Sequence, residues 1–288
     1  MLLLWALPLG LSIGAVSGFF GVGGGFLLTP ILLLLGYSPA TAITISLLYS
    51  MSTSISGALK YIQSRRILWK VTLFLSISGM VGTQLAQPLV LYMEESKIDG
   101  PVISTLYIVL LAYFSISMLS KGQTIDEENS SISVSPLRTI LIGLLGGFIS
   151  STLGVGGGFV MVPLLIHVLR LPPRLAVGTS LTSIFFIVLT GFFSYIQTVT
   201  IPTTLAILLV SGAVIGARIG AGMTDSFTET TIKNLLGILY FFTLVSILLQ
   251  LFHQSISGLL ILFLYIICLM CLFIYQYWTK KKRLFFLK

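Results

Sequence analysis

The sequence predicts an all-α, polytopic membrane protein of two inverted repeats, each opening with a glycine-broken re-entrant helix pair, and one additional C-terminal transmembrane helix. Composition is the first observation behind this prediction: 56% of the 288 residues are hydrophobic and only 8% are charged, whereas soluble domains carry about 25% charged residues. An internal duplication is the second, because residues 21–30 (GVGGGFLLTP) recur at 154–163 as GVGGGFVMVP. Matched apolar segments interrupted by glycine are typical of proteins built from two copies of one membrane unit.

The duplication continues beyond the glycine motif at an offset of 133 to 134 positions. Residues 57–63 (GALKYIQ) correspond to residues 191–197 (GFFSYIQ), and the Gly79 and Gly82 pair corresponds to Gly212 and Gly216. The stretch between the copies is polar and rich in Ser, Glu and Asn, which is typical of a flexible connection. The predicted organisation is membrane repeat 1 at 1–120, a polar cytoplasmic linker at 121–136, membrane repeat 2 at 137–253, and an extra transmembrane helix with a basic tail at 254–288.

Two of the apolar segments are too short to cross a bilayer, because a spanning helix needs about 20 residues. These segments, 26–36 and 156–169, each follow a glycine break. We expect each to return to the side from which the chain entered, as the second arm of a re-entrant hairpin, a backbone that is stable only where protein or a polar cavity surrounds it. The other apolar segments are predicted at 2–20, 40–62, 68–92, 101–120, 137–152, 175–198, 201–224, 231–252 and 255–278.

The distribution of Lys and Arg indicates the orientation of these segments. If the glycine-broken pairs do not cross, the basic loops at 60–70 and 170–174, the linker and the tail at 280–283 lie on one side, which the positive-inside rule makes cytoplasmic. Each repeat then has three crossings, so the second copy is inverted relative to the first. The expected location is the inner (plasma) membrane, with the N-terminus outside and the C-terminus in the cytoplasm.

The glycine breaks supply most of the candidate substrate-binding residues. Glycine lets the backbone turn at positive φ, and the helix that follows presents free N–H groups and the positive end of its dipole. Two such N-termini that face one another would bind an anion without any formal charge. The alternative is that these glycines only permit close helix packing. The candidates are Gly23, Gly24 and Gly25 in the first copy, and Gly156, Gly157 and Gly158 in the second.

Two hydroxyl groups and one arginine complete the candidate site. Ser46 and Ser180 correspond at an offset of 134, and their hydroxyls could donate to an oxyanion or serve in ordinary helix packing. Arg218 lies inside a predicted span, where arginine is a functional candidate by default. It also precedes Asp225 by only six residues, about 9 Å along a helix, so it could instead extend to the membrane surface. Tyr61, at a segment end, is interpreted as an interfacial anchor in preference to a gate.

Other classes of function find little support in the sequence. We expect neither metal nor cofactor, because Cys268 and Cys271 share a helix face with no nearby histidine and zinc needs about four ligands. No constellation of His, Cys, Asp or Glu lies within the spans, so no catalytic residue and no enzyme are predicted. The formal charge of +8 comes from basic residues that flank apolar segments, which act as orientation signals and do not suggest nucleic acid.

The duplicated GxGGGFxxxP segments, each followed by a Pro/Ala-rich turn and a Thr/Ser-containing helix, resemble those of the TauE/SafE-type sulfite exporter family. The run GAVIGARIG at 212–220 adds to this resemblance, which covers about residues 8–250. It implies a permease in the lipid bilayer for a small anion, sulfite or an organosulfonate. The resulting expectation is a secondary transporter that works by alternating access, and the alternative is an anion channel for small oxyanions. A homo-oligomer, the transport direction and the coupling ion are left open.

Overall fold

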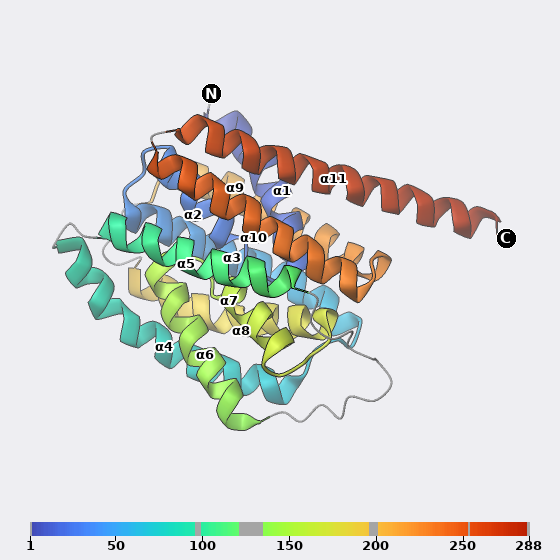
Figure 1. The fold of residues 1–288 in the computed structure, drawn as a ribbon, viewed down its shortest axis with the longest axis horizontal. Coiled ribbons are helices and arrows are strands. Elements are labelled where there is room, and N and C mark those ends of the chain that lie inside the picture. The colour runs from blue at the N-terminus through green and yellow to red at the C-terminus, as the bar shows by residue number, and fades with distance from the viewer. Residues whose placement is uncertain (1, 96–98, 121–134, 196–200, 253, 287–288) are drawn as a thin grey trace.

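The computed structural model describes residues 2–95, 99–120, 135–195, 201–252 and 254–286, and every regular element within these ranges is a helix (Figure 1). The all-α prediction is therefore confirmed for the described part, and the predicted segments agree with the helices to within a few residues, except that the last helix continues eight residues beyond the predicted 278. The α-helices are α1 (Leu2–Phe20), α2 (Gly25–Leu34), α3 (Pro39–Gln63), α4 (Trp69–Glu95), α5 (Asp99–Leu119), α6 (Pro136–Leu153), α7 (Gly158–His167), α8 (Pro173–Tyr195), α9 (Thr203–Met223), α10 (Glu229–Leu251) and α11 (Ser255–Phe286), with a 3₁₀ turn η1 at Thr224–Ser226.

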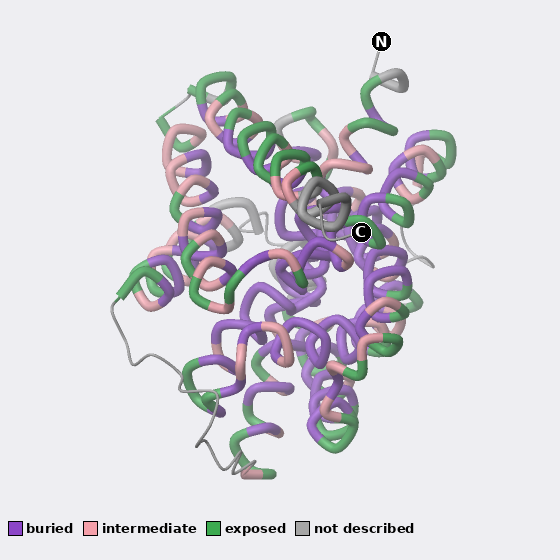
Figure 2. Tube along the Cα trace, turned by 90° about the vertical axis from the view of Figure 1, so that its right-hand side faces the viewer, coloured by how far each residue is buried: buried purple, intermediate pink, exposed green. Residues whose placement is uncertain are grey.

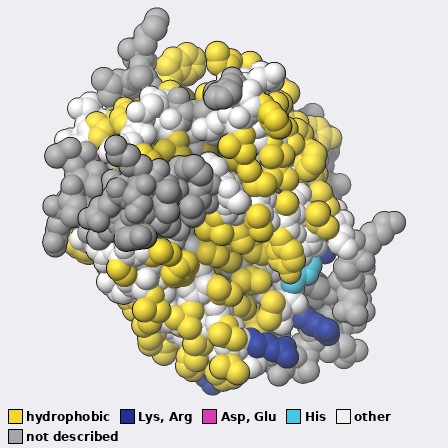
Figure 3. Space-filling model, turned by 60° about the vertical axis from the view of Figure 1, so that its left-hand side comes forward, with side chains coloured by type: hydrophobic (Ala, Val, Ile, Leu, Met, Phe, Trp, Pro, Cys, Tyr) yellow, Lys and Arg dark blue, Asp and Glu magenta, His cyan; other side chains and the backbone are white. Residues whose placement is uncertain are grey.

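The protein is a multi-pass membrane protein. Six of the described helices, α3, α6, α8, α9, α10 and α11, are long and apolar enough to cross a bilayer. The outer surface agrees, because Leu73, Ile77, Val81 and Leu85 follow one another at four-residue spacing on α4 and are 49–62% exposed. Four-residue spacing places these side chains on one helix face. Figure 3 shows an extended apolar face with Lys and Arg gathered at one edge of it, as expected for a surface in contact with lipid.

The two glycine motifs interrupt the helices where the sequence predicts. Helix α1 ends at Phe20 and α2 begins at Gly25, and α6 ends at Leu153 and α7 begins at Gly158. Both α2 and α7 have 10 residues, about 15 Å at the α-helical rise, so neither crosses a bilayer. Both breaks lie in the buried centre of the molecule, which Figure 2 shows as the purple tubes surrounded by more exposed helices.

Helices from the two halves of the chain pack against one another in pairs. Helix α1 packs along α9, and α6 packs along α4, so each half contributes a helix to a pair with the other half. Both pairs run parallel, because the contact partners advance together along the two helices. The contacts are Gly10 to Leu209, Gly14 to Ala213 and Gly18 to Ala217 for α1 and α9, and Gly143 to Leu75 and Gly147 to Gly79 for α6 and α4.

Helices α3 and α8, which occupy corresponding positions in the two halves, pack against one another in opposite directions. Near one end of the pair, Leu47 contacts Gly191, and farther along the pair Gly57 contacts Leu181. The residue numbers rise on one helix as they fall on the other. An element and its copy are therefore antiparallel.

Three connections meet at one end of the helices, which we call the basic end: 64–68, 168–172 and 224–228. Arg66 pairs with Asp225, and Arg174 pairs with Glu229. Helix α6 starts at this end, because it runs parallel to α4, which begins just after the first of these connections. Helix α7 finishes there, because its last residue, His167, lines a pocket with the end of α5. Although α6 is long enough to cross, the α6–α7 pair thus begins and ends at the same end.

Helix α11 packs against α10 and lies along the outside of the other helices, with its C-terminal part extending beyond them (Figure 1). The Ser246 carbonyl lies near Gly258, and the Tyr265 hydroxyl donates to the Leu235 carbonyl at 2.8 Å. These contacts make α10 and α11 antiparallel. The predicted additional C-terminal helix is present in the structure.

Candidate functional site

The first glycine break is held together by two serine hydroxyls. Gly21 and Gly23 both have φ of +71°, a conformation that glycine adopts without steric cost. The Ser17 hydroxyl accepts a hydrogen bond from the Gly24 N–H at 2.7 Å. The Ser50 hydroxyl accepts from the Gly25 N–H at 2.9 Å and donates to the Gly23 carbonyl at 2.9 Å. The turn and the first N–H groups of α2 are therefore tied to α1 and α3 by buried hydrogen bonds.

The second break also turns at glycines of positive φ, but its last glycine differs from the counterpart Gly24, whose φ is −12°, and so does the neighbouring side chain. Gly154, Gly156 and Gly157 have φ of +66°, +85° and +75°, and α7 begins at the next residue, Gly158. The residue that corresponds to Ser50 at an offset of 134 is Ile184, and its Cδ1 atom lies against the position that a side-chain carbon added at Gly158 would occupy. Isoleucine has no hydrogen-bonding group, so it cannot cap the N-terminus of α7 as Ser50 caps that of α2.

The two breaks contact one another in the core. A side-chain carbon at Gly25 would lie 2.6 Å from the Gly154 carbonyl oxygen, and one at Gly158 would lie 2.6 Å from the Gly21 carbonyl oxygen. The Thr29 hydroxyl also donates to the Gly154 carbonyl at 3.2 Å. These corresponding contacts bring the N-termini of α2 and α7 into one buried region. Only glycine allows so close an approach of two backbones.

Ser46 and Ser180 both lie beside these breaks. The Ser180 hydroxyl donates to the Gly21 carbonyl at 3.1 Å, and the Ser46 carbonyl lies 3.1 Å from the position of a side-chain carbon at Gly25. The Ser46 hydroxyl is fully buried and has no hydrogen-bond partner in the described structure, and the same is true of Ser54. Ser46 and Ser54 flank Ser50 at four-residue spacing on one face of α3. A row of three hydroxyls, two of them unpartnered, therefore faces the interior.

Arg218 lies away from the breaks. It is exposed on α9, beside Ile215 and Ile219, which are both 51% exposed. The opposite face of α9 carries Gly216 and Gly220, whose backbones lie against α1. The structure therefore places Arg218 on the exposed face of α9, opposite the face that packs against α1.

Tyr61 differs from its interpretation as an interfacial anchor. It is 2% exposed, and its hydroxyl donates to the Gly18 carbonyl at 3.1 Å and lies 2.7 Å from the Thr224 hydroxyl. It therefore joins three segments beneath the basic end. The interpretation was wrong because the residue's place near the end of a segment does not reveal that α1 and η1 pack over it.

Sequence reasoning gave little weight to two residues that organise the first break. Ser50 belongs to the same Ser/Thr stripe as Ser46, one turn further along, and this spacing is the signal that could have singled it out. Ser17 lies in a predicted apolar segment, and nothing in its spacing indicates that its hydroxyl contacts Gly24. Among the described residues, no group of three or more His, Cys, Asp or Glu side chains is placed to hold a metal.

Helices that cross a bilayer, together with two helix breaks buried between them, define a class: polytopic membrane proteins with a discontinuous-helix site, the architecture of many transporters. The chain matches the family model described as "Sulfite exporter TauE/SafE" over residues 6–247, and it therefore belongs to this family. It is a membrane transporter of the TauE/SafE type and not an enzyme. Helix α11 lies beyond the matched residues.

Three relatives illustrate the similarity, and each is described as a "probable membrane transporter protein". YunE of Bacillus subtilis (strain 168) is 27% identical over 272 residues, which cover 87% of this chain and 97% of that protein. A protein of Xylella fastidiosa (strain 9a5c) is 24% identical, with 86% of this chain and 94% of its own length covered. MJ0441 of Methanocaldococcus jannaschii is 26% identical, with coverage of 82% and 93%. No solved structure is significantly similar to the chain.

Proposed function

We propose that the protein is a secondary transporter that moves a small anion, sulfite or an organosulfonate, by alternating access. The observation that carries this proposal is the meeting of two helix N-termini, at Gly25 and Gly158, in the buried core. Each N-terminus carries a positive partial charge and backbone N–H donors. Apart from tyrosine, the buried polar side chains of the described residues are all Ser or Thr, so the donors available there are neutral. Sulfite is proposed as the anion because the description of the matching family names it.

The two N-termini offer an anion unequal numbers of partners. Ser17 and Ser50 already accept hydrogen bonds from the N-terminus of α2, while Ile184 leaves α7 without an equivalent cap. We therefore propose that the N-terminus of α7 supplies free N–H donors to the anion, and that the unpartnered hydroxyl of Ser46, a residue beside the first break, adds a further donor. A bound oxyanion would satisfy donors that are otherwise costly to bury.

Alternating access requires two arrangements of the same site, and inverted repeats supply a two-fold relation that allows this. The antiparallel packing of α3 against its copy α8 supports such inversion. The turns after α2 and α7 give further support. Gly36 and Arg170 correspond at an offset of 134 and share a left-handed conformation, with φ of +85° and +52°. The same turn is uncharged in one copy and basic in the other, as expected if the two turns lie on opposite sides of the membrane.

The same charges support an orientation in which the basic end faces the cytoplasm of a cell whose inner membrane holds the protein. The N-terminus then lies outside and the C-terminus inside. Single-cysteine labelling tests this, after Cys268 and Cys271 are replaced by Ser. Ser120→Cys and Arg170→Cys should react with an impermeant reagent from the same side, and Leu35→Cys from the other. Labelling of Ser120→Cys and Arg170→Cys from opposite faces would contradict both the re-entrant pairs and the inversion.

Transport itself is tested in proteoliposomes with sulfite, organosulfonates, sulfate and phosphate, under imposed pH and sodium gradients. We expect saturable uptake and counterflow of sulfite or a sulfonate, both lost in Gly24→Leu and in Gly157→Leu. Gly222→Leu is the matched control, because the nearest atom to a side-chain carbon there is Lys60 Cε at 3.8 Å. Flux that neither saturates nor supports counterflow would indicate an anion channel instead. Normal transport in both glycine variants would show that the glycines serve packing alone.

A further inference from the structure

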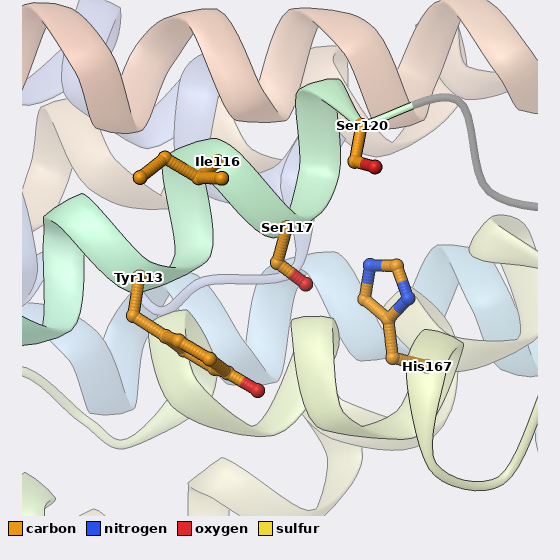
Figure 4. Close-up of a pocket in the computed structure, with 5 residues that line it drawn as sticks. All are labelled: Tyr113, Ile116, Ser117, Ser120 and His167. Carbon is orange, nitrogen blue, oxygen red and sulfur yellow. The ribbon is translucent and has the colours of Figure 1, made fainter.

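A pocket lies away from the helix breaks, between α5 and the end of α7 at the basic end. It has a volume of about 390 Å³ and is lined by Tyr113, Ile116, Ser117, Ser120 and His167. Figure 4 shows the hydroxyl groups of Tyr113, Ser117 and Ser120 and the imidazole of His167 directed toward a common space. None of these residues takes part in the contacts of the glycine breaks.

The polar side of this pocket is suited to an anion. Lys233, on α10, donates from Nζ to the Ser120 carbonyl at 3.3 Å, which places its ammonium group at the pocket. Partial burial and the neighbouring Lys233 charge lower the pKa of His167, which lies at the end of the non-crossing helix α7. The Lys233 ammonium and the hydroxyl groups are donors, whereas the His167 ring already hydrogen-bonds the Ser117 backbone. The pocket therefore has one full positive charge and several neutral donors in close proximity.

The other side of the pocket is apolar and opens toward the bilayer. Ile116 is 72% exposed and Tyr113 is 62% exposed, and on α5 they precede Ser120 by about one and two helical turns. A ligand in this pocket would therefore meet hydrocarbon along Tyr113 and Ile116 and donors at Ser120 and Lys233. This order of apolar contacts followed by donors, at the edge of a membrane helix, matches an acyl chain followed by a phosphate.

We infer that this pocket binds the phosphate headgroup of an anionic membrane phospholipid, with the acyl chains lying along Tyr113 and Ile116. Basic pockets between transmembrane helices bind such headgroups on the cytoplasmic side of membranes. A lipid fits better than free phosphate, because a free anion would leave the exposed apolar part of the pocket without a partner. The bound lipid would contact α5, α7 and α10 together. It would thereby hold α7, the short helix after the second glycine break, in place.

Native mass spectrometry of the full-length protein, released from vesicles of phosphatidylglycerol and phosphatidylcholine, tests this inference. We expect retained phosphatidylglycerol in the wild type and about tenfold weaker retention in Lys233→Gln, because charge-assisted hydrogen bonds contribute more than neutral ones. His167→Gln should weaken retention to a smaller extent. Lys70→Gln is the matched control, since it removes the same charge from an exposed position on α4 and should retain the lipid.

Three outcomes would overturn the inference. Equal loss of lipid in Lys70→Gln would show a general effect of surface charge. Equal retention of the two lipids by the wild type would show that the headgroup charge is not recognised. Displacement of phosphatidylglycerol by millimolar inorganic phosphate would show a site for free phosphate. Circular dichroism of each variant confirms that its helices are intact, and because transport is not the readout, failure here leaves the proposed function unaffected.

Discussion

Ser50 and Ile184 occupy corresponding positions in the two halves, but only Ser50 forms hydrogen bonds with a glycine break. Its hydroxyl bridges the Gly25 N–H and the Gly23 carbonyl, each at 2.9 Å, while the Ile184 side chain packs against Gly158 and Gly23. The turn into α2 is therefore fixed by a buried hydroxyl of α3, whereas α8 presents an apolar side chain to the turn into α7, whose Gly154 carbonyl accepts from the Thr29 hydroxyl instead.

Ser50→Ala should destabilise the protein by about 0.5–1.5 kcal/mol, because it removes the hydrogen bonds of the Ser50 hydroxyl with the Gly25 N–H and the Gly23 carbonyl, and these two groups then keep only their hydrogen bond with one another. Transport should fall as well, since the N-terminus of α2 is no longer fixed. Thermal unfolding in detergent and uptake into proteoliposomes measure the two effects.

The matched control is Ser52→Ala, on the same helix. The Ser52 hydroxyl donates only to the Leu48 carbonyl of its own helix, at 2.9 Å, and that carbonyl also lies within the helical hydrogen-bond pattern. We expect Ser52→Ala to remain close to wild type. Equal destabilisation by the two substitutions would show that the bridge across the first break has no special role.

Gly156→Ala and Gly36→Ala separate backbone strain from packing at the glycine turns. Both residues have φ of +85°, so both substitutions carry the left-handed penalty of about 1–2 kcal/mol. An added carbon at Gly36 meets no atom within 4 Å, whereas at Gly156 it lies 3.0 Å from Ser50 Cβ. Overpacking adds about 1–3 kcal/mol, so Gly156→Ala should be the more destabilising substitution. Comparable melting temperatures would contradict the close contact between the second break and Ser50 on α3.

The sequence was most informative where a residue's role is local. The length of α2, its start at Gly25 and the corresponding start of α7 at Gly158 follow from glycine spacing, because glycine ends helices wherever it takes up positive φ. Contacts between the halves could not be predicted in the same way. The burial of Tyr61 under Thr224 depends on segments more than 160 residues apart in the chain, and nothing in the spacing of Arg218 decided which face of α9 would point outward.

Arg218→Gln should transport its substrate at nearly the wild-type rate and affinity, because the side chain is exposed on the outer face of α9 and away from the breaks. Stability should change by no more than about 0.5 kcal/mol, as at other surface positions. The concentration dependence of uptake is the measurement. A rise of tenfold or more in the half-saturating concentration would indicate that Arg218 contacts the anion. In that case α9 would have to change its orientation during the transport cycle.

The ion pair between Arg66 and Asp225 joins a connection of the first half to one of the second at the basic end. The two side chains are 29% and 34% exposed, so the pair should contribute only about 0.2–1 kcal/mol to stability. A contribution of this size still shifts a balanced equilibrium between closed and open forms by up to about fivefold. Arg66→Glu should therefore favour opening at the basic end and raise the labelling of a cysteine placed beneath it, at Thr224.

The double variant Arg66→Glu/Asp225→Arg should restore the wild-type labelling rate, because it re-forms the pair with the charges exchanged, and a double-mutant cycle isolates that term. Arg65→Glu reverses a charge one residue away and should leave labelling unchanged. If Arg66→Glu and Arg65→Glu accelerate labelling equally, the effect comes from the overall charge of the basic end. If the double variant behaves as the sum of its single substitutions, the two residues act independently and the ion pair does not hold this end closed.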